Sequence, residues 1–333
     1  MTELHYKKVS VVMCTYNGEK YIREQIDSII KQTYPIYELI IRDDGSTDAT
    51  CSIIKEYQLK YPFIKLINSG KHLGVNDNFY KVMKMANGDY IAFSDQDDIW
   101  HHEKIEEQVK AIGDACMCAH ESRSFKGDKG GFSSFDPRPR NYSLLRILFS
   151  TAFAGHTIMI SRKFRDEVSF ITVSACPYGT WDAVLAIAAG AKNSIVFLNK
   201  VLVEHRRLGN SLTNIKDYDS KNNVLLWCLR NFKDARAVMR WAFNDYCNLL
   251  LRIQSDDPIY KEGLLACKYV KGKGLINYIH YTLFCLKHKS EITYTNSNNA
   301  LKQAFRAILF PITSCWYFRV VVKRKQEEKQ HEP

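Results

Sequence analysis

Three carboxylates fall within four residues of one segment, SDQDDIW, at Asp95, Asp97 and Asp98. Side chains two apart in an extended chain point the same way, so Asp95 and Asp97 can share one target. Such a cluster is repulsive unless a cation neutralises it. Carboxylate oxygens suit Mg²⁺ and Mn²⁺, and either ion can hold a diphosphate. We therefore predict a divalent-cation and diphosphate site at Asp95 and Asp97.

A fourth acid, Asp182, lies near the start of an otherwise apolar helix that we predict within YGTWDAVLAIAA. The apolar neighbours of Asp182 give no reason for a solvated charge at this position. Two interpretations stay open from the residues alone. Asp182 is either an acid placed favourably in the dipole at a helix N-terminus or a functional carboxylate.

The order of apolar runs and helix-period segments from Val9 onward predicts an α/β fold with a mostly parallel sheet flanked by helices. Besides a later strand at Ala152–Ser161, we expect strands at Val9–Cys14, Glu38–Asp44, Ile64–Ser69 and Gly88–Asp95. Polar residues stand at the carboxyl ends of these strands, including Thr15–Asn17, Asp43–Asp44 and Asp95–Asp98. Ligands bind at that edge of open α/β sheets, so these side chains are expected to meet in one site.

Composition indicates an ordinary globular chain with a preference for anionic partners. The 333 residues exceed the size at which one core keeps growing, so about two packing units are expected. Lys and Arg number 47 against 36 Asp and Glu, which gives a net charge of +11. Neither a G-x-x-x-x-G-K-[ST] nor a G-x-G-x-x-G loop occurs, which disfavours ATPase and dinucleotide-oxidoreductase functions. The polar first residues predict no signal peptide, so the ten cysteines are expected to be reduced thiols in a cytoplasm.

Beyond about Asn214 the chain becomes helical, aromatic and basic, which predicts one domain over residues 1–214 and a second region over 215–333. The first divides into halves of about 1–110 and 111–214. The most apolar pieces of the second, Leu275–Leu286 and Ala307–Phe318, are shorter than the roughly 18 to 20 residues of a spanning helix. Two interpretations remain open for them: core helices, or helices that dock on an anionic bilayer surface.

Several segments together resemble family 2 glycosyltransferases of the GT-A fold, a Rossmann-like nucleotide-diphospho-sugar transferase fold. The similarity is greatest to the rhamnosyltransferase-like members of bacterial surface polysaccharide synthesis. The matching segments are SVVMCTYNGEKYI, RDDGSTDAT, GDYIAFSDQDDIW with the following EKIE, AGHTIMISR and TWDAVLAIAAGAK. They span about residues 9–206 in the order and spacing of the family.

The resemblance implies a nucleotide pocket at the ends of the first two strands. Thr15, Tyr16 and Asn17 match the motif that lines this pocket, where an aromatic ring can stack on a base. Asp44 matches the acid that accepts the N3 hydrogen of uracil or thymine. From the residues alone, a turn or helix-capping role is the preferred interpretation of Asp43 and Asp48.

The resemblance also assigns the reacting groups. Asp95 and Asp97 match the metal and diphosphate motif, with Mg²⁺ or Mn²⁺ as the cofactor and Asp97 as the direct ligand. Asp182 matches the general base. Relatives often carry a histidine where this chain has Leu208, so His205 or the neighbouring arginines would have to replace it. Arg206 is a candidate clamp on the diphosphate.

The implied function is an inverting, metal-dependent transfer of a sugar from dTDP-rhamnose or a UDP-hexose to a hydroxyl of a lipid-linked oligosaccharide. The expected setting is capsule or O-antigen synthesis at the cytoplasmic membrane face, with peripheral contact to anionic lipid. Two alternatives remain: a catalytically degenerate sugar-nucleotide-binding protein, or a basic membrane- or nucleic-acid-binding protein. The acidic mouth of the sheet opposes nucleic acid, because backbone phosphates would meet carboxylates there.

Overall fold

A computed structural model describes residues 6–68, 70–126, 142–149, 153–172, 179–208, 224–292, 299–318 and 322. The predicted domain boundary at residue 214 lies outside these residues. All nine cysteines in the described ranges are free thiols. Cys118 is fully buried in its strand, as expected of a small hydrophobic residue.

The core of the fold is one mixed, eight-stranded sheet in the order β3-β2-β1-β4-β7-β6-β8-β5. Its strands are β1 (Val9–Thr15), β2 (Ile36–Asp43), β3 (Ile64–Asn68), β4 (Tyr90–Ser94), β5 (Ile99–Trp100), β6 (Met117–Lys126), β7 (Met159–Ser161) and β8 (Ile195–Arg207). The first four strands pair in parallel, whereas β7 runs antiparallel to both of its neighbours. The predicted α/β class and mostly parallel sheet are confirmed.

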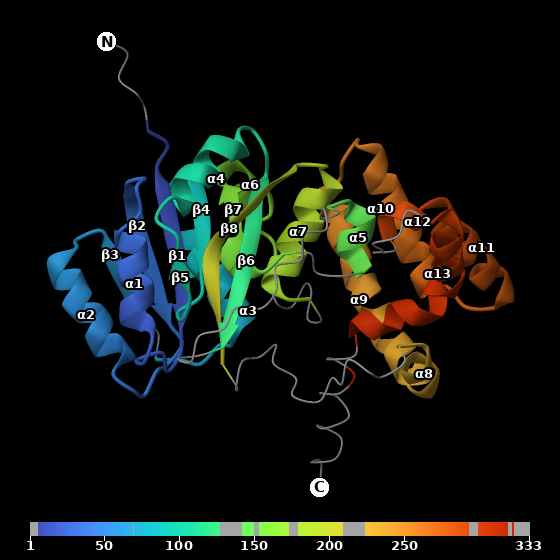
Figure 1. The fold of residues 1–333 in the computed structure, drawn as a ribbon, viewed down its shortest axis with the longest axis horizontal. Coiled ribbons are helices and arrows are strands. Elements are labelled where there is room, and N and C mark those ends of the chain that lie inside the picture. Colours follow the sequence, from blue (N-terminus) through green and yellow to red (C-terminus); the bar gives the residue numbers. More distant parts are fainter. Residues whose placement is uncertain are drawn as a thin grey trace, which may run out of the picture.

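Helices cover both faces of the sheet (Figure 1). They are α1 (Ile22–Ile30), α2 (Thr50–Lys60), α3 (Val75–Met85), α4 (Lys104–Ile112), α5 (Leu144–Phe149), α6 (Arg162–Glu167) and α7 (Trp181–Ala191). Alternation within β1 explains the two layers: Val11 packs with α1, α2 and α4, and Val12 packs with α3 and α7. The carboxyl ends of β1, β2 and β4 therefore lie at the edge of a sheet that has well-packed helices on both faces.

The C-terminal region is helical, as the sequence predicts. It comprises α8 (Val224–Arg230), α9 (Phe232–Ile253), α10 (Pro258–Lys271), α11 (Leu275–Lys287), α12 (Lys289–Ile292), α13 (Ala300–Thr313) and a final 3₁₀ turn, η4 (Ser314–Phe318). These helices share the core that contains α5 and α7 and lie at the end of the molecule opposite α2 and β3 (Figure 1). Within the described ranges, none of the helices has both the length and the hydropathy needed to cross a bilayer.

The prediction of one continuous strand over Ala152–Ser161 is wrong in its middle. Residues Gly155–Thr157 form a 3₁₀ turn, η2, and only Met159–Ser161 pair as β7. A Cβ atom on Gly155 would lie 2.3 Å from Cζ2 of Trp181, so the turn packs directly against that indole. This close packing places η2 beside the first residue of α7.

Replacing Gly155 with Ala is expected to destabilise the fold by about 1–3 kcal/mol, because the added methyl overpacks a buried ring. Urea unfolding measures the effect. Ala154→Ser, which adds one atom at the exposed neighbouring residue, is the matched control and is expected to leave the unfolding midpoint unchanged. Equal stability of Gly155→Ala and wild type would show that Trp181 does not require the close approach.

Candidate functional site

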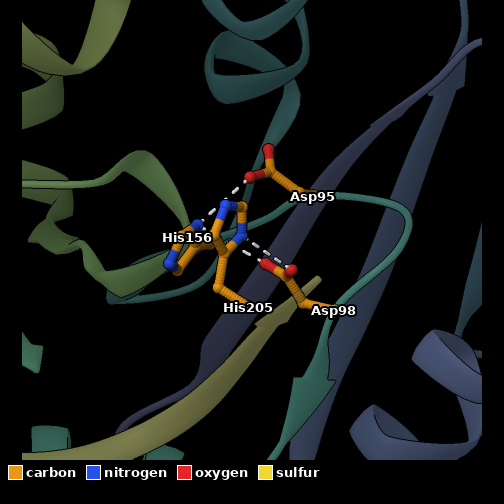
Figure 2. Close-up of side chains that lie close together, drawn as sticks. All are labelled: Asp95, Asp98, His156 and His205. Carbon is orange, nitrogen blue, oxygen red and sulfur yellow. Dashed lines mark hydrogen bonds and ion pairs between the residues drawn. The ribbon is translucent and has the colours of Figure 1, made fainter. Parts of the chain in front are cut away.

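Two carboxylates and two imidazoles gather at the carboxyl end of β4 (Figure 2). Nδ1 of His156 lies 3.2 Å from Oδ2 of Asp95 and 3.4 Å from Oδ2 of Asp98. Nδ1 of His205 lies 3.0 Å from Oδ1 of Asp98, and the two imidazole rings stack with centroids 4.6 Å apart. One ligand atom from each of the four residues falls within 4.8 Å of the others.

Asp98 is the buried centre of this group. Its Oδ1 atom accepts hydrogen bonds from Nδ1 of His205 and from the backbone N–H of Arg206, each at 3.0 Å. Burial raises the pKa of Asp98, but His156, His205 and the Arg206 N–H outweigh burial and hold that pKa below its usual value. For His156 the effects have the opposite sign. Burial lowers its pKa, but the charges of Asp98 and Asp95 outweigh burial and raise that pKa above its usual value. Asp98 is therefore a carboxylate already neutralised by protein groups.

The carboxylate of Asp97 differs from that of Asp98 in its hydrogen bonding. Within the described residues, no donor forms a hydrogen bond with the Asp97 carboxylate. Burial and the neighbouring charges of Asp95 and Asp98 raise the pKa of Asp97 to about 7. A carboxylate in this setting is stabilised by a cation that binds beside it.

The donor set fits a divalent cation. Carboxylate oxygens suit Mg²⁺ and Mn²⁺, and imidazole nitrogens suit transition metals better than they suit Mg²⁺. Oδ2 of Asp98 and Nε2 of His156 are buried with no hydrogen-bond partner in the described part of the chain. The group thus contains both charge and unsatisfied polar atoms that a cation or its ligands could engage.

Arg206 lies beneath the acidic segment with little exposure. Its Nε atom donates to the backbone oxygen of Asp97 at 2.9 Å, and its guanidinium packs on the rings of Tyr21 and Phe125. Glu24 forms an ion pair with it. The structure therefore brings Arg206 to the backbone of Asp97, and a contact of this side chain with diphosphate stays a prediction.

The chain also brings His205, the residue named above as a replacement for the missing histidine at Leu208, into contact with Asp98. Arg207, the next arginine, is exposed. The role of His205 could not be fixed from sequence, because it depends on the pairing of β5 with β8, which sets Ile99 opposite Glu204. That register places Asp98, the residue before Ile99, beside His205, the residue after Glu204.

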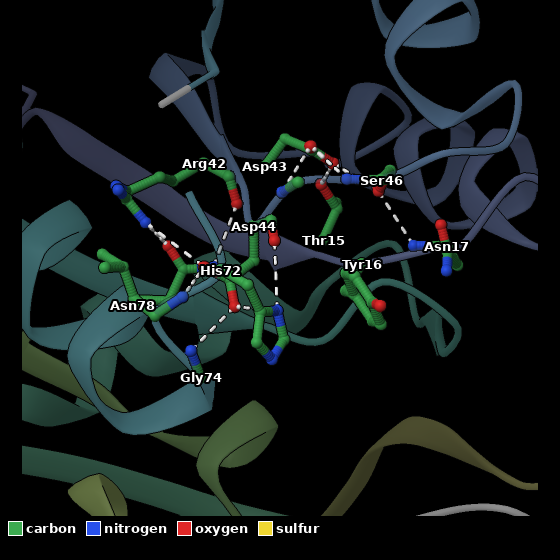
Figure 3. Close-up of polar contacts among 12 residues, drawn as sticks. Thr15, Tyr16, Asn17, Arg42, Asp43, Asp44, Ser46, His72, Gly74 and Asn78 are labelled. Atoms are coloured by element: carbon green, nitrogen blue, oxygen red, sulfur yellow. Dashed lines mark hydrogen bonds and ion pairs between the residues drawn. The ribbon is translucent and has the colours of Figure 1, made fainter. Parts of the chain in front are cut away.

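Asp44 lies buried at the end of β2, in the region predicted to hold the base (Figure 3). Its two carboxylate oxygens accept the backbone N–H groups of Leu73 and Gly74 at 2.8 and 2.9 Å. Nδ1 of His72 lies 3.1 Å from the same carboxylate. Asp44 thus anchors the loop before α3, and a carboxylate oxygen can accept more than one hydrogen bond.

The predicted pocket residues of β1 divide into two groups (Figure 3). Thr15 is buried and donates to Asp43 at 2.9 Å, and Asn17 accepts the backbone N–H of Thr47 at 2.8 Å, so both hold the neighbouring loop. Tyr16 is 47% exposed and its ring centroid lies 4.8 Å from that of His72. Tyr16 is therefore the side chain free to receive a ligand ring.

Gln96 also belongs to the candidate site, although nothing in the sequence points to it. Its side chain accepts from the backbone N–H of Tyr16 at 2.9 Å and donates to the Tyr16 carbonyl at 3.1 Å. This pair of bonds ties Tyr16 to the acidic segment. A lone amide between acids carries no sequence signal for such a role.

The interpretation of Asp43 and Asp48 as turn and capping acids agrees with their contacts. Asp43 accepts the backbone N–H groups of Gly45 and Ser46 at 3.0 and 2.8 Å, and Asp48 accepts that of Thr50 at 3.0 Å. Through these hydrogen bonds, Asp43 and Asp48 hold the loop after β2 in its conformation.

Asp182 lies in the first turn of α7, where its Oδ1 accepts the N–H of Ala183 at 2.8 Å. Asn76 of α3 fixes this helix end by accepting from the N–H of Trp181 at 3.0 Å. Burial raises the pKa of Asp182, and the Asp95 charge adds to that rise, against hydrogen bonds from Thr180 and Ala183. Asp182 is therefore a carboxyl group held in place and with increased basicity, the properties of a general base.

Comparison with known sequences identifies relatives of the first half of the chain. Residues 10–167 match the model of glycosyl transferase family 2. RfbG of Shigella flexneri, named a dTDP-rhamnosyl transferase, is 46% identical over 156 residues, 45% of this chain and 54% of the relative. TuaG of Bacillus subtilis, assigned by name to teichuronic acid biosynthesis, is 28% identical over 211 residues, 62% of this chain and 82% of the relative. The chain thus spans about half the length of the Shigella protein.

Two solved structures share the fold across almost the whole chain. TarS residues 1–349 from S. aureus, in complex with UDP, superimpose with a TM-score of 0.56 at 18% identity, covering 98% of this chain and 93% of TarS. The mannosyltransferase PcManGT from Pyrobaculum calidifontis, in complex with GDP-Man and Mn²⁺, gives 0.56 at 17% identity, covering 99% and 89%. At these identities the likeness establishes the fold alone.

Proposed function

Because residues 10–167 match the model of glycosyl transferase family 2, we propose that the chain is an inverting glycosyltransferase that moves a sugar from a nucleoside-diphosphate donor to a hydroxyl group. One observation carries the proposal: a buried carboxyl group of raised pKa, Asp182, stands in the electrostatic field of the acidic segment at Asp95. The combination supplies a base for the acceptor and a charged site for the leaving group.

The proposed step is a single displacement. Asp182 takes the proton of the acceptor hydroxyl, the oxygen attacks the anomeric carbon, and the bond to the diphosphate oxygen breaks on the opposite side. General-base help of this kind contributes about 10²- to 10⁴-fold to a rate. A retaining mechanism would have no use for Asp182 as a base.

We assign the cation to the Asp95 and Asp97 side of the acidic segment. Asp98 already accepts hydrogen bonds from His205 and Arg206, whereas Asp97 has no donor among the described residues and a pKa of about 7. A Mg²⁺ or Mn²⁺ ion held there would supply positive charge to the departing diphosphate. Asp98 then orients the two histidines, as outer partners of metal sites commonly do.

We assign the donor base to the exposed ring of Tyr16 and to the carboxylate of Asp44. A carboxylate that accepts the base N3 hydrogen favours uracil or thymine. The name of the Shigella relative makes dTDP-rhamnose our first candidate donor, and the UDP bound to TarS keeps a UDP-hexose as the second.

Tyr16→Ala is expected to weaken donor binding by about 1–3 kcal/mol, roughly 5- to 150-fold, because base–aromatic stacking contributes that much. Tyr16→Phe keeps the ring and is expected to bind like wild type. Titration of the nucleoside diphosphate by calorimetry checks both. Loss of affinity in the Phe variant would show that the hydroxyl, and not the ring face, makes the contact.

We propose a lipid-linked oligosaccharide as the acceptor, in capsule or O-antigen synthesis, with the enzyme on the cytoplasmic membrane face. The net charge of +11 supports an anionic surface as the neighbour. The rhamnosyl-transfer and teichuronic-acid names of the two relatives support a cell-surface glycan.

A donor panel with purified protein and Mn²⁺ or Mg²⁺ tests the proposal. We expect release of nucleoside diphosphate from dTDP-rhamnose or a UDP-hexose, dependent on the cation and increased by a hydroxyl acceptor. Tight donor binding without any release under all conditions would instead support a catalytically degenerate binding protein. Retention by polyanions with a steep salt dependence and no donor binding would support the non-enzyme alternative.

A further inference from the structure

Two adjacent C-terminal helices leave large apolar side chains in solvent. On α11 these are Leu275, Ile276, Ile279 and Leu283, with Leu275 75% exposed. On α13 they are Leu301, Phe305 and Ile308, with Leu301 81% exposed. The two helices pack against each other, and we call these seven side chains the α11/α13 apolar face.

The apolar face is not required by the core. On α11 the spacing of 275, 279 and 283 forms one helical stripe, opposite the stripe that buries Tyr281, Phe284 and Cys285. On α13 the stripe 301, 305 and 308 is likewise separate from the buried Ala307 and Phe310. Each helix is therefore apolar on two sides, and only one side is used for folding.

The charged residues of α11 and α13 have one sign. Neither helix contains an Asp or Glu, whereas Lys302 and Arg306 lie on α13 and are exposed. Lys287 lies at the end of α11 and pairs with Glu262 of α10 at 2.7 Å. Lys273 stands exposed directly before α11. Apolar side chains bordered by Lys and Arg are the pattern of a surface that lies on an anionic bilayer.

We propose that the α11/α13 apolar face docks the protein on an anionic lipid bilayer, with the apolar side chains inserted among the acyl chains and the cations at the headgroups. The inference rests on the membrane-bound acceptor of the proposed function. It does not depend on the proposed sugar-transfer reaction. A second copy of the chain is the weaker candidate, because a symmetric interface would bring Lys302 and Arg306 near their own counterparts with no acid on either helix.

The test measures cosedimentation of the full chain with vesicles of phosphatidylglycerol and phosphatidylcholine, against vesicles of phosphatidylcholine alone. We expect wild type to bind the anionic vesicles only. Leu275→Ser/Ile279→Ser and Lys302→Glu/Arg306→Glu are each expected to weaken that partition about tenfold or more. The matched control Leu59→Ser/Met85→Ser changes exposed apolar residues on α2 and α3 and is expected to bind like wild type.

Equal partition of the variants and wild type would overturn the proposal, as would equal binding of wild type to neutral vesicles. A wild-type dimer in solution that the serine variant converts to monomer would assign the face to a second copy. Donor binding in vesicle-free solution, measured on the same proteins, separates the two hypotheses. If donor binding is absent but vesicle binding is as expected, the docking surface stands and the reaction fails.

Discussion

Asp182→Asn is expected to lower kcat by about 10²- to 10⁴-fold while leaving donor affinity unchanged, because a general base acts in the displacement and not in donor binding. The amide oxygen of Asn can still accept from the N–H of Ala183, so the start of α7 is retained. Rapid quench of nucleoside diphosphate release, together with donor titration, separates the rate from the affinity.

Two controls make this expectation specific. Asp114→Asn removes an exposed carboxylate after α4 and is expected to keep the wild-type rate. The wild-type rate is expected to fall as the pH drops through the pKa of Asp182, which burial raises, so the loss begins at a higher pH than for an ordinary aspartate. The residual rate of Asp182→Asn should not show this fall at low pH. Undiminished turnover in Asp182→Asn would show that Asp182 is not the general base, and a retaining mechanism would again be a candidate.

Local pattern was sufficient to predict the first half of the fold. The strand expected over Ile64–Ser69 is β3 at Ile64–Asn68, and the apolar alternation of β1 determines which helices pack on each face. Errors arose where distant residues decide. The turn at Gly155–Thr157 depends on an indole in α7, and α13 begins at Ala300 because Asn299 caps it, ahead of the apolar run at Ala307.

The candidate site shows the same limit. The acidic segment and Asp182 stand out in the sequence, since unpaired carboxylates beside apolar runs need an explanation. The contact of the histidines with Asp98 carries no such signal, because His156 and His205 come from separate segments and meet Asp98 only through the packing of η2 and the register of β5 on β8. The sequence therefore indicates which charges must be neutralised, but tertiary pairing decides which protein groups neutralise them.

Asp97→Asn is expected to remove the dependence of donor binding on Mn²⁺ or Mg²⁺. Changes to outer partners of metal ligands cost about 10- to 100-fold in metal affinity, so loss of a ligand is expected to cost about 100-fold or more. Calorimetric titration of the nucleoside diphosphate, with the cation and then with EDTA, measures the effect. EDTA should weaken binding by wild type to the level of the variant and leave the variant unchanged.

The comparison with Asp98→Asn decides where the cation lies. Asp98 holds His205 and the backbone of Arg206, so its amide variant is expected to lose about 10- to 100-fold in metal affinity as an orienting residue, less than Asp97→Asn. Because the pKa of Asp97 is raised to about 7, the metal-free fold loses stability as the pH rises from the ordinary pKa of an aspartate to about 7, and this loss is complete at pH 8. Asp97→Asn should therefore unfold no more readily than wild type in EDTA at pH 8. If Asp97→Asn binds Mn²⁺ normally and Asp98→Asn does not, the cation belongs among Asp98 and the two histidines.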